Sequence, residues 1–265
     1  MRRITQGDLA FYQFETLADA SGLAHGVYTR LGGRSAEPFD TLNVGATVGD
    51  DPACVRANRN LMYGAMGVSE EDVRTTWQVH GAEVIVIDGH TPQTWPPPQA
   101  DGIVTQYPGI ALVMRFADCV PLLFYDPVQH VIGMAHAGWR GTVVGAGPAV
   151  VKTMCEVFGC TCADIIVGIG PSIGPCCYEV GAEVVEQMGV AFGSVDNMVS
   201  PAQNGHGAHL DLWAANHHAL RGVGIEQVEI ARVCTACNTQ EFYSHRAERG
   251  RTGRFGALIM LQESD

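Results

Sequence analysis

Lysine is almost absent from this sequence, since Lys152 is the single lysine among 16 basic residues. A phosphate-binding loop of the nucleotide-hydrolase type requires a glycine, a lysine and a serine or threonine in succession. Lys152 lies in Val-Val-Lys-Thr without that glycine, so this class is excluded. A Schiff-base mechanism would depend on Lys152 alone, in a stretch predicted to be helical, and is disfavoured.

Charged residues make up only 17% of the chain, and 28 acidic residues against 16 basic ones give a net charge of −12. A negative protein repels phosphate backbones and anionic lipids, so we expect neither nucleic acid nor membrane as a partner. No apolar run reaches the roughly 18 residues of a membrane helix, and the longest is interrupted at Arg115. No apolar stretch follows the two N-terminal arginines, so we expect no signal peptide, a cytoplasmic location and reduced cysteines.

Hydrophobic residues are plentiful at 46% of 265 positions, enough for a large core. Their periodicity predicts helices at 52–66, 141–158, 179–190 and 211–222. Segments rich in Val and Ile predict strands at 83–88, 110–116, 120–125, 130–135, 164–169 and 226–233. Because strands come in runs as well as alternating with helices, we predict an α+β fold with mixed β-sheets flanked by helices, in a single domain spanning 1–265.

Two apolar segments of equal length, 120–125 and 130–135, flank the turn-like Asp126-Pro127-Val128-Gln129 and predict a β-hairpin. A symmetric loop would place Cys119 directly opposite His136. Opposed residues have Cβ atoms roughly 4.5–5.5 Å apart, close enough for a thiolate and an imidazole to share a metal or a proton.

A second histidine, His80, lies beside a glycine in Gln78-Val79-His80-Gly81, immediately before a predicted strand. Two histidines and one cysteine suit Zn²⁺, because three protein ligands leave a fourth position for water or substrate. His80, Cys119 and His136 are therefore candidate zinc ligands, and in a chain with 10 histidines and 9 cysteines a chance grouping is the alternative. Without a metal, Cys119 and His136 alone would instead suit a cysteine hydrolase.

Two further motifs compete with this interpretation. Gly170-Pro-Ser-Ile-Gly174 matches the nucleophile elbow of serine hydrolases, but a proline and two cysteines follow where a helix should begin. Cys234-Thr-Ala-Cys237 is a C-x-x-C motif, but no second pair is suitably spaced for a zinc site, so packing roles are expected. The chain has no His-x-His pair, which argues against the copper centres of a multicopper laccase.

Four motifs in order resemble the laccase-domain family, which is named for polyphenol oxidation and now described as purine nucleoside phosphorylases. They are Gln-Val-His-Gly (78–81), Ala-Asp-Cys-Val-Pro (117–121), His-Ala-Gly-Trp-Arg-Gly (136–141) and Ile-Gly-Pro-Ser-Ile-Gly-Pro-Cys-Cys-Tyr-Glu-Val-Gly (169–181). Shorter matches at 29–33, 42–45, 234–235 and 252–254 extend the resemblance over nearly the whole chain. One departure is Ser-His-Arg-Ala at 244–247, where the family usually has Ser-Tyr-Arg-Arg.

The resemblance implies zinc on His80, Cys119 and His136, and a fold like that of the cytotoxic necrotizing factor-type cysteine hydrolases. It implies phosphorolysis of adenosine, inosine and methylthioadenosine, and deamination of adenosine. Cys119 and Asp118 are then expected to be catalytic, whereas Arg140 and Asn43 are expected to bind substrate, Arg140 because a guanidinium holds phosphate with two parallel hydrogen bonds. A cell-wall precursor editing hydrolase using the Cys/His site and a non-catalytic zinc module remain the alternatives.

Overall fold

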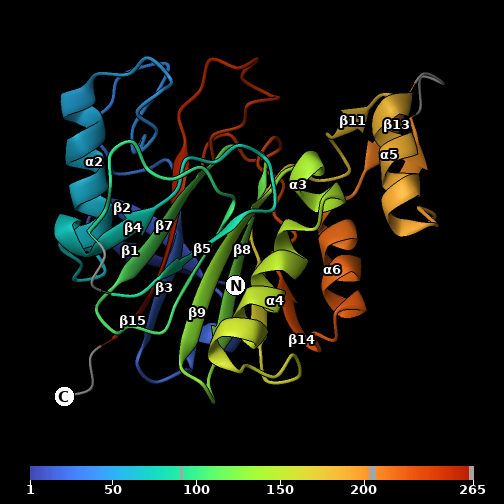
Figure 1. Ribbon diagram of the computed structural model, residues 1–265. Helices are drawn as coiled ribbons and strands as arrows, with labels where there is room; N and C mark the ends of the chain where they lie inside the picture. Colours follow the sequence, from blue (N-terminus) through green and yellow to red (C-terminus); the bar gives the residue numbers. More distant parts are fainter. Residues whose placement is uncertain (90–91, 203–206, 263–265) are drawn as a thin grey trace.

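The computed structural model describes residues 1–89, 92–202 and 207–262, which form two six-stranded sheets and one small sheet (Figure 1). In order across the first sheet lie β1 (Arg2–Gln6), β2 (Leu9–Gln13), β3 (Leu23–Tyr28), β15 (Phe255–Leu261), β7 (Ala111–Phe116) and β4 (Val73–Thr75). The second contains β14 (Gln227–Ile230), β10 (Ile166–Ile169), β8 (Val120–Asp126), β9 (Val131–Ala137), β6 (Gly102–Thr105) and β5 (Val84–Ile87). The small sheet contains β11 (Glu179–Val180), β13 (Ala208–Leu210) and β12 (Val199–Pro201).

Both large sheets are mixed, since the β4–β7, β5–β6 and β10–β14 pairs are parallel and the other pairs antiparallel. The helices are α1 (Glu15–Ala18), α2 (Pro52–Gly64), α3 (Trp139–Val143), α4 (Ala146–Phe158), α5 (Ala182–Phe192) and α6 (Leu212–Gly222), with a 3₁₀ turn at Glu70–Asp72. The predicted α+β class is therefore confirmed. Within the described ranges, no helix combines the length and the apolar character that crossing a membrane requires.

The two large sheets pack face to face, and helices cover their outer faces. Alternate residues of each strand point to opposite sides: Leu123 and Tyr125 of β8 enter the core between the sheets, whereas Leu122 and Phe124 enter the core under the helices. In Figure 1, α2 lies on one side of the paired sheets and α4 and α6 lie on the other. The order of layers is therefore helix, sheet, sheet, helices.

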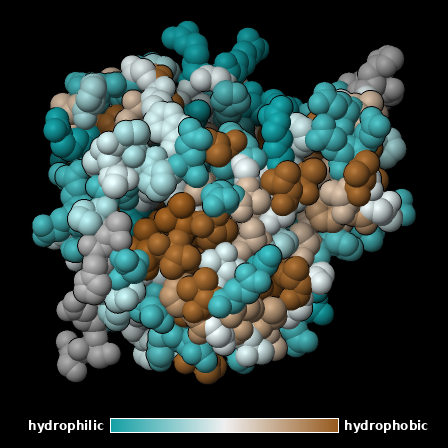
Figure 2. All heavy atoms as spheres, in the orientation of Figure 1, coloured by the Kyte–Doolittle hydropathy of each residue, from teal (hydrophilic) through white to brown (hydrophobic). Residues whose placement is uncertain are grey.

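The edge strand β5 is less covered than its neighbours. Figure 2 shows a patch of apolar residues over β5, where Val86 is 41% exposed. Edge strands leave backbone groups unpaired on one side, so this patch marks the open margin of the second sheet.

The predicted helix at 141–158 is wrong in one respect, because the chain forms two helices there. Gly145 has φ 80°, a left-handed conformation that interrupts the helical path between α3 and α4. The predicted helix at 179–190 also begins later, at Ala182, because Glu179 and Val180 pair with β13. In both places a local backbone conformation or a distant strand overrides helical periodicity.

The hairpin forms, but its predicted register is wrong. Pro121, rather than Cys119, lies opposite His136. The Asp126 side chain accepts hydrogen bonds from the amides of Val128 and Gln129, and His130 has φ 52°, so the turn begins one residue later than expected. A shift of two positions leaves every side chain on its original face. Cys119 and His136 therefore still share a face as diagonal neighbours.

Acid is expected to destabilise the fold through the buried His25 of β3. Burial lowers the pKa of His25 to about 4, and its Nε2 accepts a hydrogen bond from the Phe14 amide 2.9 Å away, which a protonated ring cannot do. Above pH 6.5 neither state is protonated and the stability is intact. As the pH falls from 6.5 towards 4, the unfolded chain takes up the proton first, and the free energy of unfolding drops by about 3 kcal/mol.

Urea titrations at pH 7 and pH 4.5 measure this loss in the wild type and in His25→Gln. The variant lacks the titrating ring, so its stability should change less between the two pH values. Equal losses in both proteins would show that His25 does not carry the effect.

Candidate metal centre and its cavity

His80 lies in the loop between β4 and β5, at a backbone position that few residues adopt. Its φ is 64°, and the amides on either side, of Val79 and Gly81, both donate to Asp101 Oδ2, at 3.0 and 2.7 Å. Asp101 is fully buried and directly precedes β6. The buried carboxylate therefore holds the loop in the conformation that presents His80.

His136 is held by the other oxygen of the same carboxylate. His136 belongs to β9. Its Nδ1 lies 2.7 Å from Asp101 Oδ1, and both side chains are buried. An ionised carboxylate only accepts, so Nδ1 donates the proton and Nε2 keeps a lone pair for a ligand. Carboxylates hold metal-binding histidines in this way.

Cys119 follows Asp118 in the turn between β7 and β8. Asp118 has φ 81°, and its carboxylate accepts from the Thr235 hydroxyl and from the Arg246 amide, both at 2.6 Å. A non-glycine residue with positive φ is strained and persists only where its surroundings hold it. The two hydrogen bonds clamp Asp118 from the C-terminal part of the chain and thereby fix the adjacent thiol.

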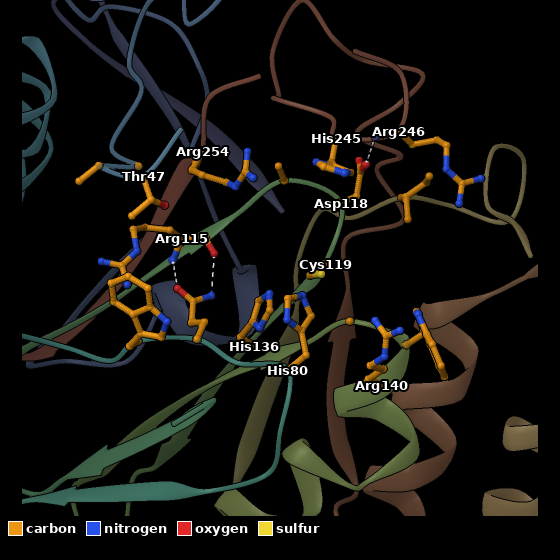
Figure 3. A pocket seen from close by; sticks show the side chains of 18 of the residues that line it. Thr47, His80, Arg115, Asp118, Cys119, His136, Arg140, His245, Arg246 and Arg254 are labelled. Atoms are coloured by element: carbon orange, nitrogen blue, oxygen red, sulfur yellow. Dashed lines mark hydrogen bonds between the residues drawn. The ribbon is translucent and has the colours of Figure 1, made fainter. Parts of the chain in front are cut away.

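The three predicted ligands lie together. One ligand atom each from His80, Cys119 and His136 lies within 4.8 Å of the other two, and Figure 3 shows the three side chains pointing towards one another. Gly138 closes this group, because a Cβ there would lie 2.7 Å from the Cys119 sulfur. The glycine of the His-Ala-Gly-Trp-Arg motif is thus required for space at the site.

The pKa values of Cys119 and His136 are shifted even without a metal. Burial by itself raises the pKa of Cys119, but the charge of His136 and hydrogen bonds to both histidines lower it to about 6. Burial lowers the pKa of His136, but the charge of Cys119 and the hydrogen bond with Asp101 raise it to about 9. At neutral pH the thiol is therefore a thiolate, the form that binds metals.

A cavity of about 580 Å³ opens above the three ligands, within the size range of small-molecule sites. Five arginines line it, namely Arg59, Arg115, Arg140, Arg246 and Arg254, and so do the aromatic residues Trp77, Trp95, Trp139 and Tyr178. Asp118 is the one acidic residue among the described residues of the lining. The cavity is therefore strongly positive in a chain whose net charge is −12, which suits an anionic ligand with a flat ring.

Arg140 and Asn43, both expected to bind substrate, lie in different environments. Arg140 lines the cavity and stacks on the ring of Trp139 at 4.5 Å, which leaves its N–H groups free to face a ligand. Asn43 is fully buried outside the lining: it donates to Gly45 and Asp50 and accepts from the Arg254 amide. The geometry thus gives Asn43 the task of shaping the loop beside Arg254, and direct contact with substrate stays a prediction.

Several residues at the site escaped the sequence-based interpretation. Asp101 is separated from His136 by 35 residues, and only the rule that metal-binding histidines have a carboxylate partner could have prompted a search for it. Arg115, Arg254 and Tyr178 also line the cavity. His245 and Arg246, in the segment that departs from the family pattern, line it as well, so the departure falls at the site itself.

The serine-hydrolase motif does not form an active site. The side chain of Ser172 is fully buried, and its backbone pairs with the chain at Val233 and Thr235. A nucleophile elbow must present its hydroxyl at the surface of a site. The competing interpretation is therefore excluded.

The model of the family described as multi-copper polyphenol oxidoreductase laccase matches residues 24–262, nearly the whole chain. This chain belongs to that family. The match covers His80, Cys119 and His136 together with the lining residues of the cavity. The family resemblance inferred from the motifs is therefore confirmed.

Relatives and solved structures agree over almost the full length. A purine nucleoside phosphorylase of Streptomyces coelicolor is 38% identical over 91% of this chain and 96% of its own. Purine nucleoside phosphorylase YlmD of Geobacillus stearothermophilus is 36% identical over 92% of each chain. The crystal structure of YlmD from Geobacillus stearothermophilus superposes with a TM-score of 0.91 at 32% identity, over 98% of this chain and 99% of that one. The crystal structure of YfiH from Bacillus licheniformis superposes with a TM-score of 0.89 at 32% identity, over 97% of both chains.

Proposed function

We propose that residues 1–265 form a zinc-dependent purine nucleoside phosphorylase domain that acts on adenosine, inosine and methylthioadenosine. The observation that carries the proposal is the cavity in which five arginines and four aromatic side chains surround the His80, Cys119 and His136 group. The arginines can bind phosphate, and the aromatic side chains can stack on a purine ring. The names of the relatives support the same activity.

The three ligands fit zinc. Their donor atoms are two imidazole nitrogens and one thiolate sulfur, a set that zinc binds with a fourth position open. The Asp101 carboxylate fixes the lone pair of His136 Nε2, and the lowered pKa of Cys119 supplies the thiolate. When bound, the metal would act as a Lewis acid towards an oxygen of substrate or water.

The protein's own residues account for the binding of both substrates. Arg140, Arg246 and Arg254 offer guanidinium groups that can hold phosphate with paired hydrogen bonds. Trp77 and Trp95 are 46% and 68% exposed at the cavity, so their faces are open to stack on a purine. Phosphate then attacks C1′ of the nucleoside, the C1′–N9 bond breaks, and the base takes up a proton. The free base and ribose 1-phosphate leave, or methylthioribose 1-phosphate where the substrate is methylthioadenosine.

The same site is proposed to deaminate adenosine, a reaction that consumes water and releases inosine and ammonia. This second activity needs no phosphate, because water is the only co-substrate. The two reactions can therefore be separated by composition of the buffer alone.

The phosphorylase proposal is tested by measuring base release and ammonia release with and without phosphate. Base release should rise with phosphate, saturate and yield ribose 1-phosphate, whereas ammonia release should persist without phosphate. Free ribose at an unchanged rate in phosphate-free buffer would mean a hydrolase. If neither base nor ammonia is released from any purine nucleoside, the result would favour the alternative function, a cell-wall precursor editing hydrolase.

Arg140→Ala should lower the rate of phosphorolysis by about tenfold to a hundredfold and lower the rate of deamination less. This corresponds to the loss of a charge-assisted hydrogen bond that contributes roughly 1.5–3 kcal/mol. Arg140→Lys should restore only part, because lysine keeps the charge but loses the planar fork. Arg56→Ala is the matched control, since Arg56 is exposed on α2 outside the cavity lining. An equal loss of both activities in Arg140→Ala would contradict the assignment of Arg140 to phosphate.

A further inference from the structure

Four cysteines meet at a second place in the molecule, outside the metal centre described above. Two lie in the loop before β11 and two in the C-x-x-C motif after β14, and their sulfur atoms all lie within 4.8 Å of one another. This four-cysteine cluster consists of Cys176, Cys177, Cys234 and Cys237. The sequence offered no second pair at zinc-finger spacing, but the fold supplies one from 60 residues away.

The distances within the four-cysteine cluster fit a single ion. The Cys237 sulfur lies 3.3 Å from that of Cys177 and 3.5 Å from that of Cys176. In a tetrahedral site with metal–sulfur bonds near 2.3 Å, the sulfurs are about 3.8 Å apart. An iron–sulfur cluster has several irons and sulfides between its ligands, and sulfurs within 4.8 Å of one another leave no room for them.

A backbone amide points at one sulfur of the four-cysteine cluster. The Gly174 amide donates to the Cys234 sulfur at 3.2 Å. Gly174 must be glycine for this approach, because a Cβ would lie 2.6 Å from the Trp213 ring and 3.2 Å from Cys234 Cβ.

We propose that the four-cysteine cluster binds a second Zn²⁺ as a closed tetrathiolate site. Four sulfur ligands in tetrahedral array leave no open position, which is the arrangement of a structural rather than a catalytic zinc. Binding releases the four thiol protons to solvent and forms four zinc–sulfur bonds, with no change of oxidation state.

The position of this second site gives it a task. It joins the loop that carries Ile173 and Tyr178, both in the cavity lining, to the loop that carries Thr235. Thr235 donates to Asp118, the neighbour of Cys119. The second ion therefore pins the two segments that support one wall of the cavity, and the inference does not depend on which reaction the cavity carries out.

Metal analysis of the purified protein tests the inference without any activity assay. The wild type should hold about two zinc ions per chain, and Cys119→Ala and Cys237→Ser about one each, since each empties one site. The double variant should hold none. Cys162→Ser is the matched control with two ions, because its half-buried sulfur lies 3.7 Å from Cys155 in another thiol pair.

X-ray absorption of Cys119→Ala should show about four sulfur neighbours per zinc at about 2.3 Å. Should Cys237→Ser fail to fold, Cys176→Ser serves in its place, since Cys176 is also exposed. Cys119→Ala protein without bound zinc, iron in place of zinc, or a disulfide within the four-cysteine cluster in protein purified without oxygen would each overturn the inference. Loss of nucleoside activity would not bear on it.

Discussion

Cys119→Ala is expected to lower kcat/KM for purine nucleosides by about a thousandfold or more, and to remove one zinc ion per chain. Two imidazoles remain after the change, but the one anionic ligand is lost. A bound metal contributes several kcal/mol of transition-state stabilisation, and about 4 kcal/mol corresponds to a thousandfold in rate. Cys119→Ser should behave alike, because a serine hydroxyl stays protonated where the pKa of this thiol is about 6.

Cys54→Ala is the control for the loss of a half-buried thiol, since Cys54 lies on α2 away from the cavity. A chelator distinguishes a metal ligand from a metal-free nucleophile at Cys119. If Cys119 is a ligand, the wild type should lose activity in chelator and regain it with zinc, whereas a metal-free Cys119–His136 pair would stay active. Full activity and unchanged zinc content in Cys119→Ala would contradict the role of Cys119 as a ligand.

The ligand triad could be predicted from sequence because two of its members lie close in the chain. A single hairpin brings Cys119 and His136 near each other, and the strand pattern of alternating apolar segments identifies that hairpin. The register was missed because the hydrogen bonds of Asp126 and the left-handed His130 shift the turn. Faces alternate with a period of two, so an error of two positions kept the two ligands on the same side.

The residues that could not be predicted come from distant segments. Asp101 reaches His136 across the β6–β9 pairing, and a carboxylate carries no local sign of which histidine it contacts. The four-cysteine cluster depends on the isolated bridge between Ser172 and Cys234, which joins two loop segments far apart in the chain. Such long-range pairings follow from the whole sheet order, and a local pattern contains no information about it.

The arginines of the cavity also come from distant segments, so their grouping could not be predicted from the sequence. Net charge predicted an acidic protein with no anionic partner of the nucleic-acid type. The fold nevertheless concentrates Arg59 of α2, Arg115 of β7 and Arg254, the residue directly before β15, around one cavity. Burial lowers the pKa of Arg115 to about 10, so it still carries its charge at neutral pH. A small anion meets this local field rather than the average charge of the chain.

Asp101→Asn is expected to weaken zinc binding at the His80, Cys119 and His136 site by about a hundredfold, at the upper end for lost partners of metal ligands. Asp101 Oδ2 accepts from two backbone amides, so the asparagine must place its oxygen there. Its NH₂ group then faces His136 Nδ1, which has to become the acceptor. The imidazole proton moves to Nε2, and the lone pair that would bind the metal is lost.

Asp126→Asn is the matched control, because Asp126 is also a fully buried aspartate of the second sheet that accepts from two backbone amides. It contacts no metal ligand, so zinc affinity should be unchanged even if the stability falls. Zinc affinity by chelator competition, read beside the melting temperature of the metal-free protein, separates the two effects. If Asp101→Asn lowers the melting temperature but binds zinc as tightly as the wild type, Asp101 is a structural residue and does not set the tautomer of His136.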